Sequence, residues 1–229
     1  MQPMTDKETP QKVLMSWSSG KDSAWAFHRL RQDPGIEVAG LLTTVNAEFD
    51  RVAMHAVRRN LLERQAAAAQ TRLWIVDLPY PCSNTQYEGA MRRVVDRALD
   101  AGISAIAFGD LFLRDIREYR ERQLAGTGMS PLFPLWMQDT AELAKLMLAS
   151  GLKARVTCVD PKVLDPSFAG REWNAAFLDD LPEGIDHCGE NGEFHTFVYD
   201  GQIFSHPIPI RPGEVVERDG FVFADILPG

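Results

Sequence analysis

The sequence predicts an α/β protein in which a parallel-sheet domain is followed by a smaller α+β domain. Three observations support this. Apolar strand-like runs alternate with amphipathic stretches from Val13 to about Gly109, a pattern typical of parallel strands joined by crossover helices. A Ser/Gly-rich turn, residues 18–23, follows the first apolar run and opens a helical stretch. After about residue 130 the pattern changes to strands and loops and closes with a hairpin signal, Asp219-Gly220.

The expected elements of the first domain follow from this alternation. The expected strands are Val13–Trp17, Glu37–Thr44, Arg72–Asp77 and Ser104–Phe108. The expected helices are Asp22–Arg31, His55–Ala69, Gln86–Ala101 and Arg114–Ala125. Ligands bind at the carboxyl ends of the strands in such sheets, so the loops after these strands are the expected binding edge.

The second domain is expected to contain one helix and several strands. We expect a helix over Thr140–Ser150 and strands over Lys153–Asp160, Glu193–Tyr199 and Ile203–Ile208, before the closing hairpin. The predicted division is a flexible N-terminus over residues 1–11, a nucleotide-binding domain over 12–129 and a substrate-binding domain over 130–229.

Composition excludes several classes of protein. The chain has 229 residues, 45% of them hydrophobic, and can bury a sizeable core. Its net charge of −8 disfavours broad binding to nucleic acid. There is no apolar run of about eighteen residues and no apolar core near the N-terminus, so we expect a cytoplasmic protein that does not contact a membrane. The three cysteines form no disulfide or zinc pattern, and a homodimer is left open.

The turn after the first strand has the features of a phosphate site. Backbone N–H groups and the positive end of a helix dipole meet there. The Walker A glycine spacing and the G-x-G-x-x-G pattern are both absent. The segment is instead close to S-G-G-x-D-S and resembles the loop of the PP-loop ATP pyrophosphatases, with Ser19 in place of the usual first glycine. If that position needs a positive φ, Ser19 stores about 1 kcal/mol of strain.

Further segments resemble the diphthine–ammonia ligase family in the same order along the chain. The strongest is residues 188–196, which is similar to that family's G-E-x-G-E-F-H-T element. The other segments are residues 51–55, 84–88, 108–110, 117–121 and 134–136. The resemblance covers about residues 12–207 and implies a Rossmann-like, HUP-type PP-loop domain. A bacterial relative of this family is one of the alternatives that stay open.

The residues and the resemblance together predict a site for ATP and Mg²⁺. The residues expected to contact the nucleotide are Ser18, Ser19, Gly20, Lys21, Asp22, Ser23, Thr43, Thr44, Met54, His55, Gly109 and Asp110. Lys21 can neutralise a phosphate oxygen, and Asp22 is the candidate magnesium ligand. Alternatives stay open: Asp22 and Asp110 could cap helices, and His55 could be a cap or a surface group.

The resemblance assigns the second domain to the substrate and ammonia pocket. Glu190, Glu193 and His195 are the catalytic candidates, because a carboxylate can take a proton from ammonium and a histidine can shuttle it. On a strand, Glu193 and His195 would share one face and Phe194 the other. The residues expected to bind the substrate are Asn84, Tyr87, Glu88, Gly189, Gly192 and Thr196. A solvated hairpin is the alternative for this segment.

These observations predict an ATP-dependent ligase that forms AMP and pyrophosphate. A substrate carboxylate, on a protein side chain or a small metabolite, is adenylated, and ammonia then displaces AMP to leave an amide. The family's known substrate is the diphthine residue of elongation factor 2, and a bacterial relative would need a different carboxylate. Two alternatives are a PP-loop enzyme that modifies a tRNA base and a nucleotide-binding module without ligase activity.

Overall fold

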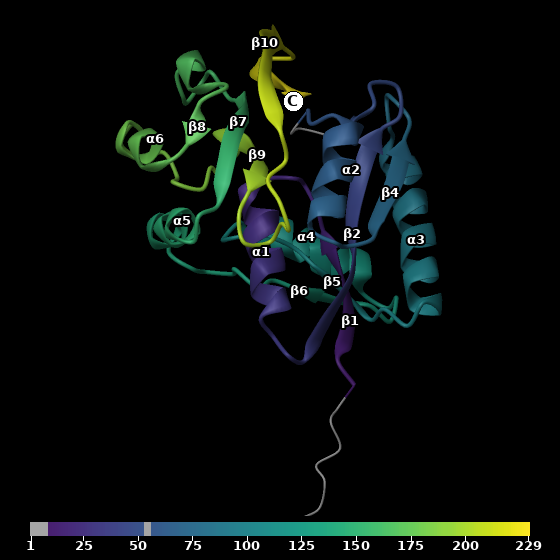
Figure 1. The fold of residues 1–229 in the computed structure, drawn as a ribbon. Helices are drawn as coiled ribbons and strands as arrows, with labels where there is room; N and C mark the ends of the chain where they lie inside the picture. The colour runs from purple at the N-terminus through teal and green to yellow at the C-terminus, as the bar shows by residue number, and fades with distance from the viewer. Residues whose placement is uncertain (1–8, 53–55) are drawn as a thin grey trace, which may run out of the picture.

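The computed structural model describes residues 9–52 and 56–229, which form two β-sheets with helices around them (Figure 1). Residues 1–8 of the expected flexible N-terminus lie outside the described part. The first sheet has the order β3-β2-β1-β5-β6, and β4 pairs with β2. Its strands are β1 (Gln11–Ser16), β2 (Ile36–Asn46), β3 (Arg51–Val52), β4 (Leu73–Leu78), β5 (Ala105–Ala107) and β6 (Ser130–Leu132). All its pairings are parallel except β2 with β3, so the predicted α/β class is confirmed.

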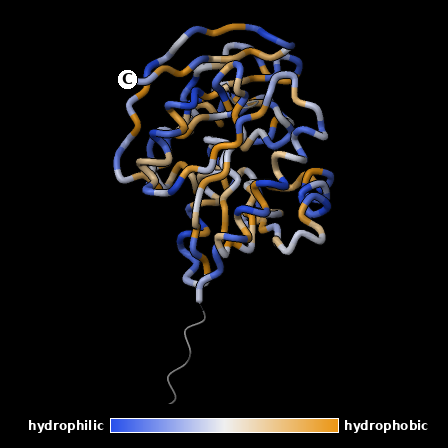
Figure 2. Tube along the Cα trace, turned by 90° about the vertical axis from the view of Figure 1, so that its right-hand side faces the viewer, coloured by the Kyte–Doolittle hydropathy of each residue, from blue (hydrophilic) through white to orange (hydrophobic). Residues whose placement is uncertain are grey.

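Helices cover both faces of this sheet. Val13 and Met15 of β1 belong to one buried cluster with residues of α1 (Lys21–Arg31) and α2 (Arg59–Ala68). Leu14, between them, belongs to a second cluster with α3 (Asn84–Asp100) and α4 (Arg114–Leu124). Successive strand residues point to opposite faces, so α1 and α2 lie on one face and α3 and α4 on the other. Figure 2 shows hydrophobic stretches along the strands in the middle of the molecule.

The second sheet is antiparallel throughout. Its order is β10-β11-β7-β8, and β9 pairs with β7. The strands are β7 (Lys153–Val159), β8 (Glu172–Trp173), β9 (Phe194–Asp200), β10 (Ile210–Arg218) and β11 (Phe221–Pro228). The accompanying helices are α5 (Thr140–Ala149), η1 (Pro166–Phe168) and α6 (Ala175–Asp179). The predicted hairpin at Asp219-Gly220 is confirmed as the β10–β11 turn.

The two sheets meet on the α1–α2 side of the first sheet. Val198 of β9 donates a hydrogen bond from its N–H to the carbonyl of Ser19, at 3.0 Å. Arg51 and Arg58 both form ion pairs with Asp225 of β11. One buried hydrophobic cluster includes side chains from both sheets, such as Met15 and Phe197. Residues 130–132 form β6 of the first sheet, so the first half extends past the expected boundary at 129/130. The division into two domains stays our proposal, with the two halves sharing a core.

One predicted strand is wrong. Residues 203–208 form turns and bends instead of a strand. Phe204 closes a turn by donating its N–H to Gly201, and Pro207 and Pro209 have no N–H for a ladder. The helix expected from residue 55 begins at Arg59. Within the described residues, no helix has the length and apolar character needed to span a membrane.

Candidate active site

A single cleft of about 1070 Å³ lies at the carboxyl ends of β1, β2 and β5. It extends between α3 and α4, and residues 189–190 and 194–196 from the second half of the chain line its other side. In the strand order β2-β1-β5, β1 lies between the other two. The turn after β1 therefore lies in the middle of the cleft, with the end of β2 on one side and the end of β5 on the other.

The turn after β1 has a strained backbone at its second residue. Ser19 adopts φ +71°, which is the left-handed conformation that favours glycine. Gly20 is the N-cap of α1, and its N–H lies 3.3 Å from the Ser18 hydroxyl oxygen. The Ser18 and Ser23 hydroxyls are 3.1 Å apart, and both residues line the cleft. The turn therefore presents two hydroxyls beside the start of a helix.

Gln65 of α2 holds the turn from behind. Its side chain is fully buried, and its amide oxygen accepts a hydrogen bond from the indole N–H of Trp17, at 2.9 Å. Its amide nitrogen donates to the carbonyls of Ser19 and Val198, at 3.0 and 2.6 Å. Gln65 therefore ties together β1, the turn and β9. It was not among the predicted site residues, because a glutamine in an alanine-rich helix carries no sequence signal for this role.

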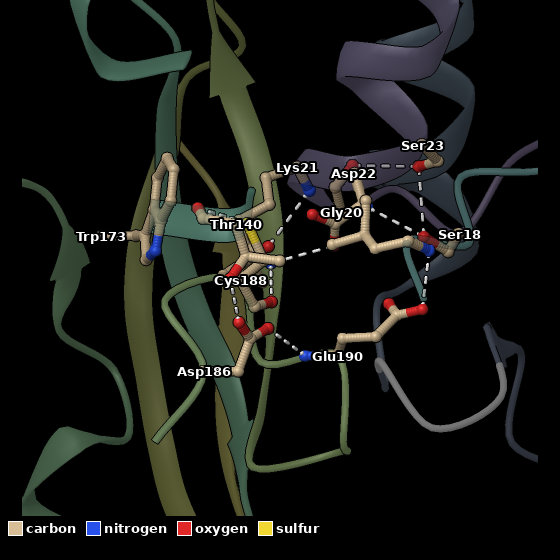
Figure 3. A network of polar contacts seen from close by, with 12 residues as sticks. Ser18, Gly20, Lys21, Asp22, Ser23, Thr140, Trp173, Asp186, Cys188 and Glu190 are labelled. Carbon is tan, nitrogen blue, oxygen red and sulfur yellow. Dashed lines mark hydrogen bonds and ion pairs between the residues drawn. The ribbon is translucent and has the colours of Figure 1, made fainter. Parts of the chain in front are cut away.

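Lys21 points toward the second sheet (Figure 3). Its backbone N–H donates to the Thr196 hydroxyl at 3.1 Å, and its ammonium donates to Asp22 and to the carbonyl of Cys188. The ammonium also lies 5.1 Å from the ring centroid of Phe194, and the residue is only 1% exposed. Lys21 was predicted to neutralise a phosphate oxygen, and it lines the cleft while its ammonium contacts Asp22 and, in the second half of the chain, Cys188.

Three carboxyl groups approach the cleft around this turn. Asp22, Asp110 and Glu190 line it, and Asp22 and Asp110 raise the pKa of Glu190 through their charges. The Glu190 carboxylate accepts hydrogen bonds from the N–H groups of Leu111 and Phe112, at 2.7 and 3.4 Å. Burial is the largest effect and raises the pKa of Glu190 to about 7. Burial likewise raises the pKa of Asp22 and of Asp110, against the opposing charges of Lys21 and Arg120.

The residues present fit a magnesium ion held jointly with phosphates. Asp22 Oδ1 is buried and has no hydrogen-bond partner within residues 9–52 and 56–229. In the same described part, no group of three His, Cys, Asp or Glu side chains is arranged as a metal site. Mg²⁺ usually takes one or two carboxylates and completes its shell with phosphate oxygens and water. Asp22, with Asp110 or Glu190, would be such a partial set.

Gly109 allows the β5 end to approach the turn closely. A Cβ atom at this position would lie 2.9 Å from the backbone nitrogen of Ser23 and 3.0 Å from the carbonyl carbon of Asp22. Such contacts are too short for any other residue without a shift of the helix start. The glycine therefore brings Asp110 next to the first turn of α1.

The structure brings most of the predicted site residues to this one cleft. Those that line it are Ser18, Lys21, Asp22, Ser23, Thr43, Thr44, Tyr87, Glu88, Gly109, Asp110, Gly189, Glu190, His195 and Thr196. Among the described residues, Ser19, Gly20, Asn84, Gly192 and Glu193 are outside its lining. Met54 and His55 lie outside the described residues.

The Glu193 side chain forms hydrogen bonds within the loop of residues 186–193. It is 4% exposed and precedes β9, which begins at Phe194. Its Oε1 accepts hydrogen bonds from the Asp186 N–H and the Asn191 side chain, at 3.2 and 2.9 Å. Asp186 in turn accepts from the N–H of Glu190, at 2.8 Å. Both faces of β9 are covered, because Thr196 and Phe197 point to opposite faces and are 1% and 0% exposed.

Comparison with known proteins gives relatives of one kind. Residues 139–225 match the family described as diphthamide synthase C-terminal domain. The diphthine–ammonia ligase of Danio rerio is 34% identical over 123 residues, which is 50% of this chain and 47% of that protein. The diphthine–ammonia ligases of Homo sapiens and Mus musculus are 30% and 31% identical to this chain over 103 residues. The matched residues make up 43% of this chain and 39% of each relative.

The chain therefore covers less than half the length of these relatives. Even so, the C-terminal match includes the 186–196 segment that closes the cleft, and the curated relatives share one name. The PP-loop-like turn, the parallel sheet and these matches agree with one another. The chain is thus similar, over parts of its length, to the diphthine–ammonia ligase family.

Proposed function

We propose that this chain is an ATP-dependent ligase that adenylates a substrate carboxylate and transfers ammonia to it, forming AMP and pyrophosphate. One observation carries the proposal. The turn of residues 18–23 opens α1 in the same cleft into which Glu190 and His195 extend from the second half of the chain. A phosphate site and a pair of proton-accepting groups thus lie along one continuous surface.

The turn is suited to the first half-reaction. Ser18 and Ser23 supply hydroxyls for phosphate oxygens, and the helix start supplies partial positive charge. Lys21 would keep the turn docked on the second half, because its ammonium is already bound to Asp22 and Cys188. When bound, Mg²⁺ would offset the charge of the departing pyrophosphate. Asp22 and Asp110 are the residues that would hold it.

Glu190 and His195 are suited to the second half-reaction. A carboxyl group with a pKa of about 7 is poised between its two protonation states at neutral pH, which favours general-base catalysis. It would accept a proton as ammonia attacks the acyl-adenylate, and His195 would pass the proton on. Glu193 would position Glu190 through Asp186.

The substrate carboxylate is either a protein side chain or a small metabolite. The relatives are named for diphthine, so a diphthine-like carboxylate is one candidate. The net charge of −8 argues against a tRNA substrate.

Chromatography of the nucleotide products tests the proposal. The protein is incubated with ATP, Mg²⁺, ammonium and fractions of small carboxylic acids. We expect AMP and pyrophosphate in amounts that depend on an added acid. ADP as the main product would refute the assignment. Nucleotide binding without turnover with any small acid would leave a protein carboxylate or the non-catalytic alternative.

A further inference from the structure

The cleft continues beyond the nucleotide turn as an arm between α3 and α4. We define this arm by the apolar side chains of Met91, Val95, Ile106, Ile116 and Leu124 and by Arg120, which lies between Ile116 and Leu124 on α4. The whole cleft, about 1070 Å³, lies at the upper limit of the 300–1,000 Å³ typical of single-ligand pockets. It has room for a second ligand beside a nucleotide.

Helical spacing makes the arm a continuous groove. Tyr87, Met91 and Val95 follow one another at intervals of four on α3, and Ile116, Arg120 and Leu124 do so on α4. Residues four apart lie on the same helix face. Eight residues of helix span about 12 Å, so the two facing stripes give a groove of about that length.

Arg120 joins the arm to the acidic end of the cleft. Its guanidinium lies 4.9 Å from the ring centroid of Phe108, and its Nε lies 3.6 Å from Asp110 Oδ2. The second distance is too long for a hydrogen bond. Nε is buried and has no hydrogen-bond partner within the part of the chain that the structure describes. Tyr87 lies beside the same guanidinium. Arg120 therefore lines the arm as a cation that is ion-paired with Asp110 and keeps one donor, Nε, without a hydrogen bond in the described residues.

We propose that the α3–α4 arm binds the second substrate, a carboxylic acid with an apolar body. Its carboxylate would lie at Arg120, at the junction with Asp110 and the turn of residues 18–23. Its apolar body would lie along Met91, Ile116 and Leu124. This inference rests on the proposed function, because it names the class of carboxylate that the ligase would activate. A guanidinium matches a carboxylate in charge and geometry, and the side chains beyond it bury apolar surface.

The adenine of ATP is the competing occupant of the arm. Thr43 and Thr44, at the end of β2, line the same cleft and are not part of the arm. An adenine there would leave the arm vacant for the acid. If adenine occupied the arm, a substitution that fills the arm would lower the affinity for ATP. With adenine at the end of β2, the same substitution would leave the affinity for ATP unchanged.

Ligand-observed NMR and calorimetry test the proposal on the full chain. The probes are monocarboxylic acids of four to ten carbons, aliphatic and aromatic, and the alcohols of the same carbon skeletons. Each is added with Mg²⁺ and an ATP analogue that cannot be cleaved between the α and β phosphorus atoms. Met91→Trp fills the arm, and Arg120→Leu removes its cation. Met137→Trp and Arg114→Ala are the controls, because both residues are outside the cleft lining and exposed.

We expect acids to bind the wild-type protein and both controls about tenfold or more tightly than the alcohols do. Met91→Trp should lose acid binding, and Arg120→Leu should lose the preference for acids over alcohols. Met91→Trp should keep the affinity for the ATP analogue within about twofold, since Met91 does not contact the nucleotide turn.

Three outcomes would overturn the arm proposal while leaving the proposed function intact: no acid binds although the nucleotide does, acids bind equally to all variants, or Met91→Trp loses the nucleotide. Failure of the wild-type protein to bind the nucleotide at all would refute the proposed function itself.

Discussion

At the scale of single residues, the cleft concentrates acids in a place where their charges are poorly solvated. Burial raises the pKa of Asp22, Asp110 and Glu190, and the backbone N–H groups of Leu111 and Phe112 only partly offset this for Glu190. Such a cluster lowers stability when all its members are ionised and is suited to bind a cation or to exchange protons.

Glu190 should make the free energy of unfolding pH-dependent. Its pKa is raised from 4.5 to about 7 in the folded protein, so between these values the folded state holds a proton that the unfolded state has lost. Stability should therefore fall as the pH rises from about 5 to 8. Glu190→Gln keeps a hydrogen-bond acceptor for Leu111 but cannot ionise. The stability of this variant should therefore decrease less than that of wild type over the same pH range.

Denaturant unfolding at pH 5, 6, 7 and 8 measures this effect. The stability of Glu190→Gln relative to wild type should increase with pH. Glu183→Gln, at an exposed position of the same segment, is the control and should show no such trend. A constant difference between Glu190→Gln and wild type across this range would contradict the raised pKa.

Ser19 offers a test of backbone strain. Its φ of +71° costs about 1 kcal/mol for a residue with a Cβ atom. Ser19→Gly should raise the free energy of unfolding by about 0.5–1 kcal/mol and leave ATP affinity within about twofold. Ser19→Ala keeps the strain and should not stabilise. Equal stabilities for the two variants, measured by thermal unfolding, would mean that the strain is absent.

At the scale of elements, local sequence patterns predict turns and helix starts well. Contacts between residues distant in the sequence could not be predicted from such patterns. The turn of residues 18–23 and the hairpin at Asp219-Gly220 follow from short-range rules on glycine, serine and helix starts, and both are present. The direction of the Lys21 side chain depends on Cys188 and Thr196, which are distant in sequence. The absent strand at residues 203–208 reflects Pro207, and Pro209 just after it, which have no backbone N–H to donate.

The start of α1 should depend on one side chain of β9. The Lys21 N–H donates to Thr196 Oγ1 at 3.1 Å in a buried position, so Thr196→Val leaves this donor unsatisfied. A cost of about 1–3 kcal/mol in unfolding free energy follows, together with weaker ATP binding as the turn shifts.

Thr157 provides a matched control on β7. It is 2% exposed, and its hydroxyl oxygen has no hydrogen-bond partner within the described residues. Thr157→Val should therefore be neutral or stabilising. Equal losses for the two threonine variants, by denaturant unfolding and calorimetry with ATP, would show that the Lys21 contact contributes nothing.

At the scale of the whole molecule, residues from both halves of the chain line the cleft. The first sheet places the turn of residues 18–23. The loop before β9 places Gly189 and Glu190 in the same cleft, and β9 itself places His195 there. Gln65, Lys21 and the ion pairs of Asp225 connect the two halves around this cleft. The central claim is that a nucleotide bound at the turn contacts both halves at once.

Hydrogen exchange with and without the non-cleavable ATP analogue and Mg²⁺ tests this claim most directly. Bound nucleotide should slow amide exchange in two separate segments, residues 16–24 and residues 186–197, because both would be held closed around the ligand. The β10–β11 hairpin, residues 210–228, serves as the internal reference and should be unchanged. Protection of residues 16–24 alone, with residues 186–197 exchanging as in the free protein, would contradict a site shared by the two halves.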